Sequence, residues 1–442
     1  MKCPNCAKDF EDVPDEWIGK KVKCDHCGYM FFYEIVINQK TSAAKIDISL
    51  VTLYLIGIFI AVAESITHLM YSSIRMDLHV SETKMAIIYS ILRTTPMIIA
   101  IPIGLLLDRN KRSHLIAIGI FLFSLSNILT SFSYSFPMLM ILSVISGIGI
   151  GFILPGIISY IFDYANENHR GIALSLYLIL SGLLAPASYL LLGVFYKSWK
   201  ITFGIFGILG IVFSFLMYKL KEPKRNDNII PLAIRNLALK DTNLFKALIR
   251  PSVLIFIFAG IFYSFGNYHE WLFHYFERYK EFERNELFTP SMIGLVIMML
   301  SLFLSGYISD LYMKYNYLVN YYLIIAGIIG CFIFLPILIY TNSKLGINIV
   351  YCIMVLLFGL ARIPFMVQLL SLIKSKYRMT IYGIDTFAVW IFGSSISKIA
   401  TGALFDKFNL QIAMIVLSII FLISAIGYAL SGFYLSKELK RI

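Results

Sequence analysis

The sequence predicts an all-α polytopic membrane protein, with twelve transmembrane helices in two six-helix pseudo-repeats and a small four-cysteine zinc ribbon before them. Apolar residues make up 59% of the 442 residues and charged residues only 14%, whereas soluble domains have about 45–50% and about 25%. The apolar runs are long and continuous, which favours helices over the alternating segments of a β-barrel. Four cysteines precede the first run. A soluble globular protein is therefore excluded.

A bilayer span needs roughly 20 apolar residues, and the chain has room for twelve such runs. Their starts are expected near residues 48, 84, 114, 137, 171, 200, 252, 291, 318, 347, 380 and 409. The longest break between them is rich in Lys and Arg and leaves six spans on each side. The predicted parts are a zinc ribbon at 1–37, a first half at 45–219, a cytoplasmic linker at 220–251, a second half at 252–436 and a tail at 437–442.

Basic residues set the expected orientation, because Lys and Arg are retained on the cytoplasmic side of a membrane. With both termini in the cytoplasm, a clear majority of the 38 Lys and Arg residues fall on that side. These basic residues would lie next to the anionic lipids of the cytoplasmic leaflet, which accounts for the net charge of +12. A nucleic acid partner is therefore not expected. No apolar stretch follows a basic start at the N-terminus, so no signal peptide is expected. The predicted location is a prokaryotic inner membrane.

An internal repeat supports the division into two halves. Gly104-Leu-Leu-Leu-Asp108 at the end of span 2 recurs as Gly306-Tyr-Ile-Ser-Asp310 at the end of span 8, an offset of 202 residues. Other pairs have offsets of 208 or 209 residues: Arg170 with Arg378, Pro155 with Pro364, and Gly193 with Gly402. A duplicated unit of this kind encloses a site between its two copies.

The stretch Gly104-Leu-Leu-Leu-Asp108-Arg109-Asn-Lys111-Arg112 resembles the loop 2–3 signature of major facilitator superfamily transporters. The resemblance covers about residues 45–436 and implies secondary transport by alternating access. It also implies that the signature closes the cytoplasmic side in one state, with Gly104, Asp108, Arg109, Arg112, Gly306 and Asp310 as gating residues. Further marks are Gly147-Ile-Gly149-Ile-Gly151 with Pro155, Arg170-Gly171, and Trp199-Lys200 with Phe203.

Two positions depart from the family pattern. Ser143 stands where span 4 often carries an Arg, so a role of that Arg in proton coupling does not carry over. The second copy of the signature has Leu311 after Asp310 instead of Arg, which puts its gating role in question.

Asp108 lies in the last turn of span 2, where its carboxylate can accept hydrogen bonds from free backbone N–H groups at a neighbouring helix start. The start of span 11, at 378–381, is the expected partner. The alternative is that Asp108 and Arg109 only cap helices at the interface.

Ionisable side chains inside the predicted spans mark candidate substrate or proton sites, because each costs about 2.5–3.5 kcal/mol at the bilayer centre without a partner. Glu64 in span 1 and Arg93 in span 2 are expected at the same depth, and His68 lies one turn outward from Glu64. These three residues predict a proton or anion site. The alternative is a static salt bridge with a satisfied histidine.

The second half has its own polar positions. Arg362 in span 10 is expected near mid-membrane, beside Pro364, which tends to kink a helix. Asp385 in span 11 is a partner for Arg362 if that side chain reaches inward, while Lys398 either faces the cavity or snorkels to the surface. Asn267 and His269 in span 7 either line the site or leave the membrane with the following loop.

Arginines from both halves suggest a substrate with a carboxylate or phosphate, because a guanidinium binds paired oxygens. The predicted function is secondary active transport of a small solute, an organic anion by this hypothesis, with protons as the coupling ion. The alternative is a membrane sensor or scaffold in which the ribbon signals. No nucleotide-binding or catalytic motif is found, so an enzyme is not expected.

The N-terminal cysteines form two C-x-x-C pairs separated by 17 residues, a spacing typical of a zinc ribbon. Four thiolates give a closed tetrahedral Zn²⁺ site, which is structural and not catalytic. Acidic residues offset the lysines of this module, so a protein partner is a better expectation than nucleic acid. The predicted ligands are Cys3, Cys6, Cys24 and Cys27.

Overall fold

The computed structural model describes residues 21–23, 30–32, 48–165, 169–195, 198–223, 225, 234, 237–238, 240–265, 272, 275–277, 279–313, 315–407 and 410–441. The chain divides into two compact units, residues 1–47 and residues 48–442. Each unit is described by itself.

The first unit contains a short antiparallel β-hairpin. Strand β1 (Lys21–Lys23) pairs with strand β2 (Met30–Phe32), and Lys21 lies opposite Phe32 while Lys23 lies opposite Met30. The four predicted zinc ligands, Cys3, Cys6, Cys24 and Cys27, lie outside the described residues. In the sequence, the second C-x-x-C pair falls between these two strands.

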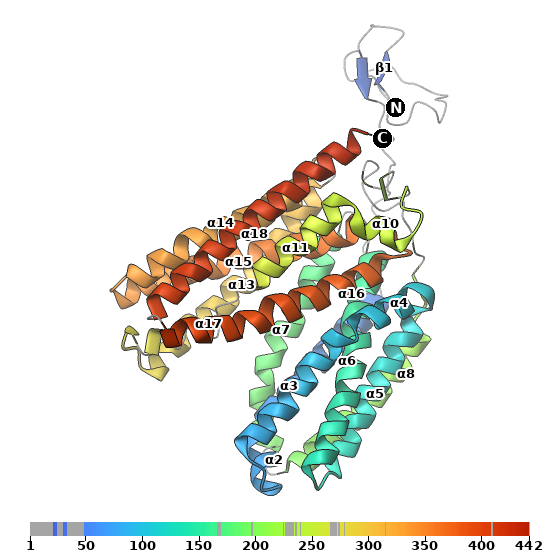
Figure 1. Cartoon of the computed structure of the whole chain (residues 1–442). Helices are drawn as coiled ribbons and strands as arrows, with labels where there is room; N and C mark the ends of the chain where they lie inside the picture. The colour runs from blue at the N-terminus through green and yellow to red at the C-terminus, as the bar shows by residue number, and fades with distance from the viewer. Residues whose placement is uncertain are drawn as a thin grey trace. The chain divides into compact units, whose positions relative to one another are not determined.

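The first half of the second unit begins with α1 (Ile48–Leu69) and the short α2 (Tyr71–Asp77). Two consecutive helices, α3 (Glu82–Ile98) and α4 (Ala100–Arg109), then bend by 45° at Ile99. Pro96 lies inside α3, three residues before this break. The remaining helices are α5 (Arg112–Ser131), α6 (Phe136–Tyr164), α7 (Arg170–Phe195) and α8 (Trp199–Lys219) (Figure 1).

The second half repeats this pattern of long helices. It comprises α10 (Leu244–Ile249), α11 (Pro251–Phe265), α13 (Arg284–Tyr312), α14 (Val319–Tyr340), α15 (Lys344–Ser371), α16 (Arg378–Ala388), a π-helix η3 (Val389–Ser395), α17 (Ile396–Lys407) and α18 (Leu410–Leu439). Helix α15 continues through Pro364, beside which a kink is expected from the sequence, whereas α3 and α4 are separated by a bend of 45°.

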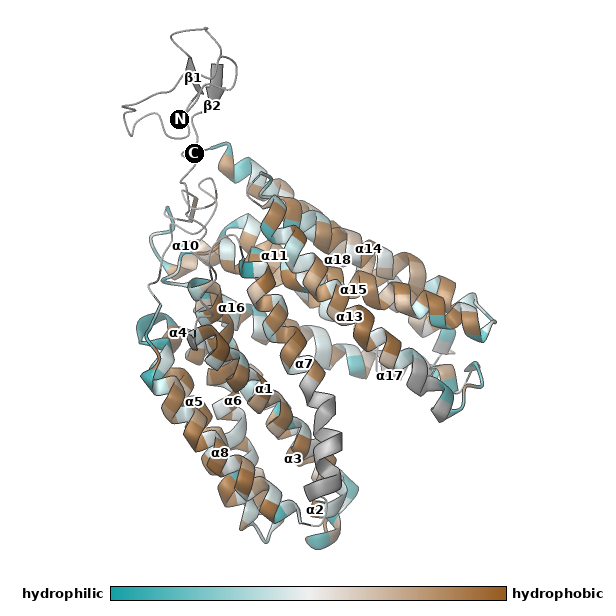
Figure 2. Cartoon of the chain, turned by 180° about the vertical axis from the view of Figure 1, so that it is seen from behind, coloured by the Kyte–Doolittle hydropathy of each residue, from teal (hydrophilic) through white to brown (hydrophobic). Residues whose placement is uncertain are grey.

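Within the described residues, nine helices are long and apolar enough to cross a membrane, and ten if the bent pair α3 and α4 counts as one span. Two shorter apolar helices, Arg170–Leu183 and Pro251–Ser264, lie where spans 5 and 7 are expected. Hydrophobic residues predominate along the helices in the view of Figure 2, and many large apolar side chains are exposed, for example Leu55, Ile141 and Phe433. Extensive exposed apolar surface is typical of a protein that lies in a membrane. The chain is therefore a multi-pass integral membrane protein.

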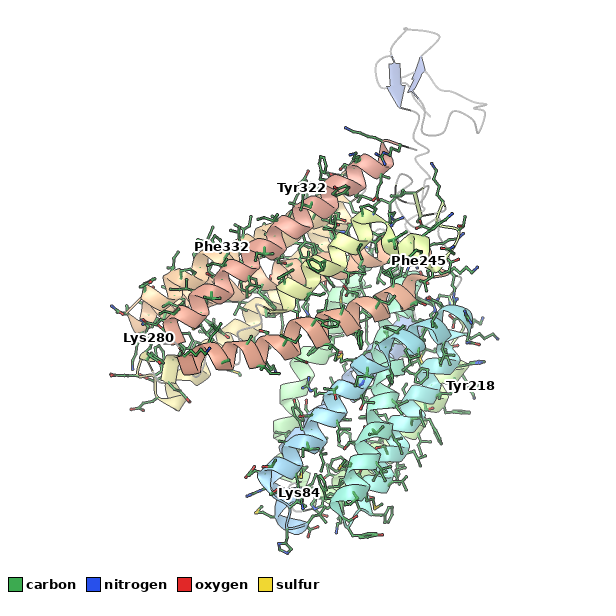
Figure 3. The ribbon with its side chains drawn as sticks, viewed as in Figure 1. Lys84, Tyr218, Phe245, Lys280, Tyr322 and Phe332 are labelled. Carbon is green, nitrogen blue, oxygen red and sulfur yellow. The ribbon has the colours of Figure 1, made fainter. Side chains whose placement is uncertain are left out.

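Two hydrophobic clusters form the core, and they divide the second unit at the linker. The first is built mainly from α1 to α8, and the second from the residues after 233. Helix pairs α4 with α16 and α7 with α13 make the main contacts between the halves. From the α4–α16 contact the helices diverge toward α2 in one half and α17 in the other (Figures 1 and 2). Lys84 and Lys280 lie at these remote ends (Figure 3).

Candidate functional site

Asp108 joins the first half to the start of α16. Its Oδ1 accepts a hydrogen bond from the backbone N–H of Met379 at 2.9 Å, and its Oδ2 accepts from the N–H of Thr380 at 2.7 Å and from the Thr380 hydroxyl at 2.6 Å. The carboxylate is 7% exposed. The first N–H groups of a helix have no hydrogen-bond acceptor inside the helix. The carboxylate of Asp108, in the other half, is their acceptor. This is the contact that the sequence predicts.

Asp310 makes the corresponding contact from the second half. Its Oδ1 accepts from the N–H of Gly171 at 2.7 Å and its Oδ2 from the N–H of Ile172 at 2.9 Å, at the start of α7. The geometry is kept although Leu311 replaces the Arg of the first copy, because the backbone contact needs only the carboxylate. We call these two carboxylate contacts the junction.

Glycines allow the helices of the junction to approach closely. A Cβ on Gly104 would stand 2.4 Å from the carbonyl oxygen of Met379, and one on Gly306 would stand 2.1 Å from Ser175 Oγ and 2.5 Å from the carbonyl oxygen of Gly171. All three distances are shorter than any van der Waals contact. Gly104 and Gly306 are thus required by backbone packing between the halves.

A buried charge cluster lies beside the Asp108 contact. Asp163 on α6 accepts from Arg112 at 2.6 Å through Oδ2 and from Arg378 at 2.6 Å through Oδ1. The side chains of all three are at most 2% exposed. Because Arg112 belongs to the first half and Arg378 to the second, one carboxylate links both halves. Arg109, the other predicted gating arginine, is exposed to solvent.

The beginning of the linker contacts the same place. Glu222 accepts from Arg112 Nε at 2.8 Å and from the N–H of Ser113 at 2.9 Å, at the start of α5. Arg225 donates to the carbonyl oxygens of Leu107, Asp108 and Asn110, at the end of α4. The linker therefore caps the two helix ends that flank the signature loop. Asp163, Glu222 and Arg225 were not predicted as site residues.

Among the predicted membrane charges, Glu64 and Arg93 interact electrostatically across α1 and α3. Glu64 is partly buried, and Arg93 is exposed with its guanidinium 5.4 Å from the ring centre of Tyr89. The side chain of His68 lies outside the described residues, as do Asn267 and His269.

In the second half, Arg362 on α15 is exposed and interacts electrostatically with Tyr263 on α11 and Tyr382 on α16. It thus faces the interior of the bundle and not α14 on the other side. Asp385 is 3% exposed, and no ion pair joins it to Arg362 among the described residues. Lys398 on α17 is exposed.

Two tyrosines connect the polar positions of the halves. Tyr177 on α7 interacts electrostatically with Glu64 and, across the halves, with Tyr382. Tyr382 in turn interacts with Arg362 and Asp385. We call Glu64, Tyr177, Tyr382 and Arg362, which these electrostatic interactions relate to one another, the polar file; its two tyrosines were not predicted as site residues. The signal for Tyr177 was its offset of 208 residues from Asp385, which equals that of Arg170 from Arg378.

A small cavity lies inside the first half, between α3, α5, α6 and α8. Its wall is mainly apolar, with Asn127, Ser126 and Ser146 as polar groups. Since it belongs to one half, a solute bound there would not be passed from one side to the other by a movement between the halves.

A family model described as Major Facilitator Superfamily matches residues 53–394. The protein belongs to this superfamily. Its neighbours of known structure are transporters and not enzymes. One is the proton:xylose symporter XylE bound to 6-bromo-6-deoxy-D-glucose, with a TM-score of 0.63 and 17% identity over 86% of this chain and 94% of that one. Another is FucP in the outward conformation, with a TM-score of 0.63 and 15% identity over 89% and 99%. At these identities the likeness concerns the fold.

Two curated relatives match part of this superfamily member. Probable polyol transporter 3 of Arabidopsis thaliana is 25% identical over 157 residues, which is 34% of this chain and 31% of that protein. Multidrug resistance protein 1 of Bacillus subtilis (strain 168) is 28% identical over 158 residues, 35% of this chain and 40% of that protein. The chain thus aligns with well under half the length of these relatives.

The glycine contact predicts a specific effect of a single methyl group. Gly104→Ala places its Cβ against the Met379 carbonyl, so α4 and α16 must separate, and we expect a loss of about 1–3 kcal/mol of stability. Gly182→Ala is the matched control, because nothing lies within 4 Å of its Cβ position. Thermal unfolding in detergent measures both. Equal unfolding temperatures for the two variants would contradict the role of Gly104.

The charge cluster predicts a larger effect at Asp163. Asp163→Asn leaves the buried guanidiniums of Arg112 and Arg378 without their shared anion, and breaking a buried pair in this way costs about 3–5 kcal/mol. Glu222→Gln removes a partner whose side chain is 20% exposed, so its effect is expected to be smaller. Thermal unfolding in detergent measures both variants, and we expect the lower unfolding temperature for Asp163→Asn. A lower unfolding temperature for Glu222→Gln would show that the linker contact contributes more to stability than the shared carboxylate.

Proposed function

We propose that the protein is a twelve-span secondary active transporter that moves a small solute by alternating access. The main support is the junction, where backbone N–H groups of each half are bound by a carboxylate of the other. Such contacts can be made and broken as a unit, which is what a movement between two halves requires. Superfamily membership and the transporters among its neighbours support the same class of function.

The predicted orientation puts the junction on the cytoplasmic side of an inner membrane, with both termini in the cytoplasm. In this proposal the described conformation is closed toward the cytoplasm. The polar file includes residues of both halves, Glu64 and Tyr177 from the first and Tyr382 from the second, and is the proposed path of the solute. A solute bound along this file would be released to the cytoplasm when the junction opens.

We propose an organic anion as the solute class. Arg93 and Arg362 belong to different halves, both are exposed, and each has an aromatic or acidic neighbour that orients it. Protonation of Glu64 would release Arg93 for a carboxylate or phosphate, which links the anion to a proton. The names of the relatives point also to sugars and polyols, so these solutes belong in the same test.

A ligand stabilises the protein by mass action, by about 2.7 kcal/mol at a concentration of 100 Kd. We expect one or more small carboxylates or phosphates to raise the unfolding temperature, more strongly at the lower of two pH values, and Arg93→Lys or Arg362→Lys to abolish the rise. Lys84→Arg, on an exposed residue at the remote end, is the control.

The measurement is thermal unfolding of the purified protein against anions, sugars, polyols and amino acids. If sugars or polyols alone raise the unfolding temperature, the anion hypothesis is wrong and the transporter assignment stays. If an anion acts equally on the arginine variants, its site lies elsewhere.

We propose further that Cys3, Cys6, Cys24 and Cys27 hold a structural Zn²⁺. The pairing of β1 with β2 on either side of the second C-x-x-C supports this, because a zinc knuckle requires a tight connection between two strands. Four thiolates would saturate the metal, so it would stabilise the module and take no part in transport. Such a module suits a protein partner in the cytoplasm.

Metal analysis of the purified full-length protein tests this site. We expect a single Zn²⁺ per chain, lost in the variant Cys24→Ser with Cys27→Ser and kept in Cys331→Ser, a buried free cysteine in α14. Zinc retained after loss of the pair would exclude the four-cysteine site.

A further inference from the structure

The small cavity inside the first half is lined by polar side chains that other described residues leave without a hydrogen bond. The four side chains concerned are those of Asn127, Thr130, Ser143 and Ser146. Asn127 is 5% exposed, Thr130 8% and Ser146 6%. Other serines of α5 are bonded, since Ser124 donates to the carbonyl oxygen of Ile120 at 2.6 Å and Ser126 to that of Leu142 at 2.7 Å. Buried polar groups are nearly always paired, so four such groups around one space call for a polar molecule between them.

Two glycine contacts establish which residues of the second half correspond to those of the cavity. The Cβ position of Gly119 on α5 lies 2.8 Å from the carbonyl oxygen of Gly149 on α6, and that of Gly327 on α14 lies 2.4 Å from the carbonyl oxygen of Leu357 on α15. Gly327 follows Gly119 by 208 residues, and Leu357 follows Gly149 by the same number. Each residue of α5 or α6 therefore has its counterpart 208 residues later.

In the second half the four counterparts are large, mostly apolar side chains. They are at most 7% exposed, and they are Leu335, Leu338, Tyr351 and Met354. The Tyr351 ring lies 2.9 Å from the Cβ position of Gly294 on α13. Leu92, which precedes Gly294 by the 202 residues that separate the two signature copies, lines the cavity together with Ser143. The fold therefore does not require polar groups here, and the first half keeps a space where the second half is packed.

The chemistry of the wall determines which class of molecule fits. No charged residue is found among the described residues that line the cavity; Arg93 lies near the ring of Tyr89, which lines it, but is not itself part of the wall. The unbonded groups are three hydroxyls and one amide, each of which can both donate and accept. Apolar side chains such as Leu139 and Leu142 form much of the remaining wall. An ion would lose its water there without gaining a counter-charge, which is unfavourable.

The size of the cavity limits the molecule to a few heavy atoms. Its volume is about 40 Å³, and a water molecule needs roughly 10–15 Å³ of such space. The described residues do not enclose it fully. We propose that this cavity binds a short neutral polyol of two or three carbons, whose hydroxyl groups bond to Asn127, Thr130, Ser143 and Ser146 while its CH₂ groups contact the apolar wall.

Such a polyol would act within one half only. Asn127 and Thr130 belong to α5, and Ser143 and Ser146 belong to α6. A molecule bonded to both pairs connects these helices at the place where the second half uses side-chain packing. Because the lining residues all belong to the first half, a movement between the halves would not carry the polyol across. The cavity is thus an accessory site, separate from the proposed path of the transported solute.

Saturation-transfer NMR of ethylene glycol and of glycerol, with the purified full-length protein in deuterated detergent, tests the site. We expect a saturable signal that is half-maximal on the order of 1–10 mM, because so small a ligand makes few contacts. Absence of a saturable signal for both molecules would show that the cavity holds only water, and the proposal would be wrong.

The second half supplies the variant that fills the cavity. Thr130→Leu with Ser146→Met copies the side chains at the corresponding positions, so we expect the signal to disappear and the unfolding temperature to stay equal or rise. Thr83→Leu with Ser90→Met makes the same changes at two exposed positions of α3 and should keep the signal. A signal that persists in the filled variant would place the polyol elsewhere and would overturn the site.

A further variant separates the loss of hydrogen bonds from the loss of space. Ser143→Ala with Ser146→Ala leaves the cavity open but removes two hydroxyls, and we expect the affinity for ethylene glycol to fall roughly ten-fold. An unchanged affinity would show that these hydroxyls do not bind the polyol. Neither measurement depends on transport, and the filled variant also shows whether a polyol that stabilises the protein does so here or at the site between the halves.

Discussion

The contact between the two halves of the second unit is centred on a buried carboxylate bound to the first N–H groups of a helix from the opposite half. Asp108 does this for α16 and Asp310 for α7. The free N–H groups at a helix start carry a partial positive charge, so a carboxylate is a stronger partner than a neutral acceptor. These contacts use backbone donors, which fixes the positions of the helices with few demands on sequence. This explains why the Asp310 contact survives the loss of the neighbouring Arg.

The charge cluster adds side-chain ion pairs beside the Asp108 contact, which the Asp310 contact does not have to the same extent. Asp163 binds Arg112 and Arg378 together, and the linker completes the cluster through Glu222 and Arg225. The Asp310 side has a simpler environment, in which Arg170 lies 4.4 Å from the ring centre of Phe162. The two sides of the junction are therefore related by the repeat but unequal in electrostatics. When the junction separates, more charged side chains must therefore be exposed to water around Asp108 than around Asp310.

Much of the fold follows from the sequence because a membrane leaves few alternatives: apolar runs must be helices. The expected starts fall within three residues of the observed ones, except that α13 begins at Arg284, seven residues before the expected start near 291. The Asp108 contact was predictable from a motif, a helix end and a repeat. Asp163, Tyr177 and Tyr382 were not, because an acid at a helix end or a tyrosine in an apolar run has many ordinary explanations. Pro364 shows the same limit: α15 continues through it, whereas the chain bends near Pro96. Tertiary packing, and not the proline itself, decides which helix breaks.

The most informative difference between the halves is at the paired positions Tyr177 and Asp385. Tyr177 packs directly on Gly57 of α1, whereas Gly260 of α11 has Val389, Tyr428 and Asp385 around it. A phenol at this position stays neutral at ordinary pH, but an acid changes charge when its surroundings change. The acid lies on the helix whose first turn is bound by Asp108. Duplication followed by a change at one position thus leaves a symmetric frame with one ionisable group that has no counterpart in the first half.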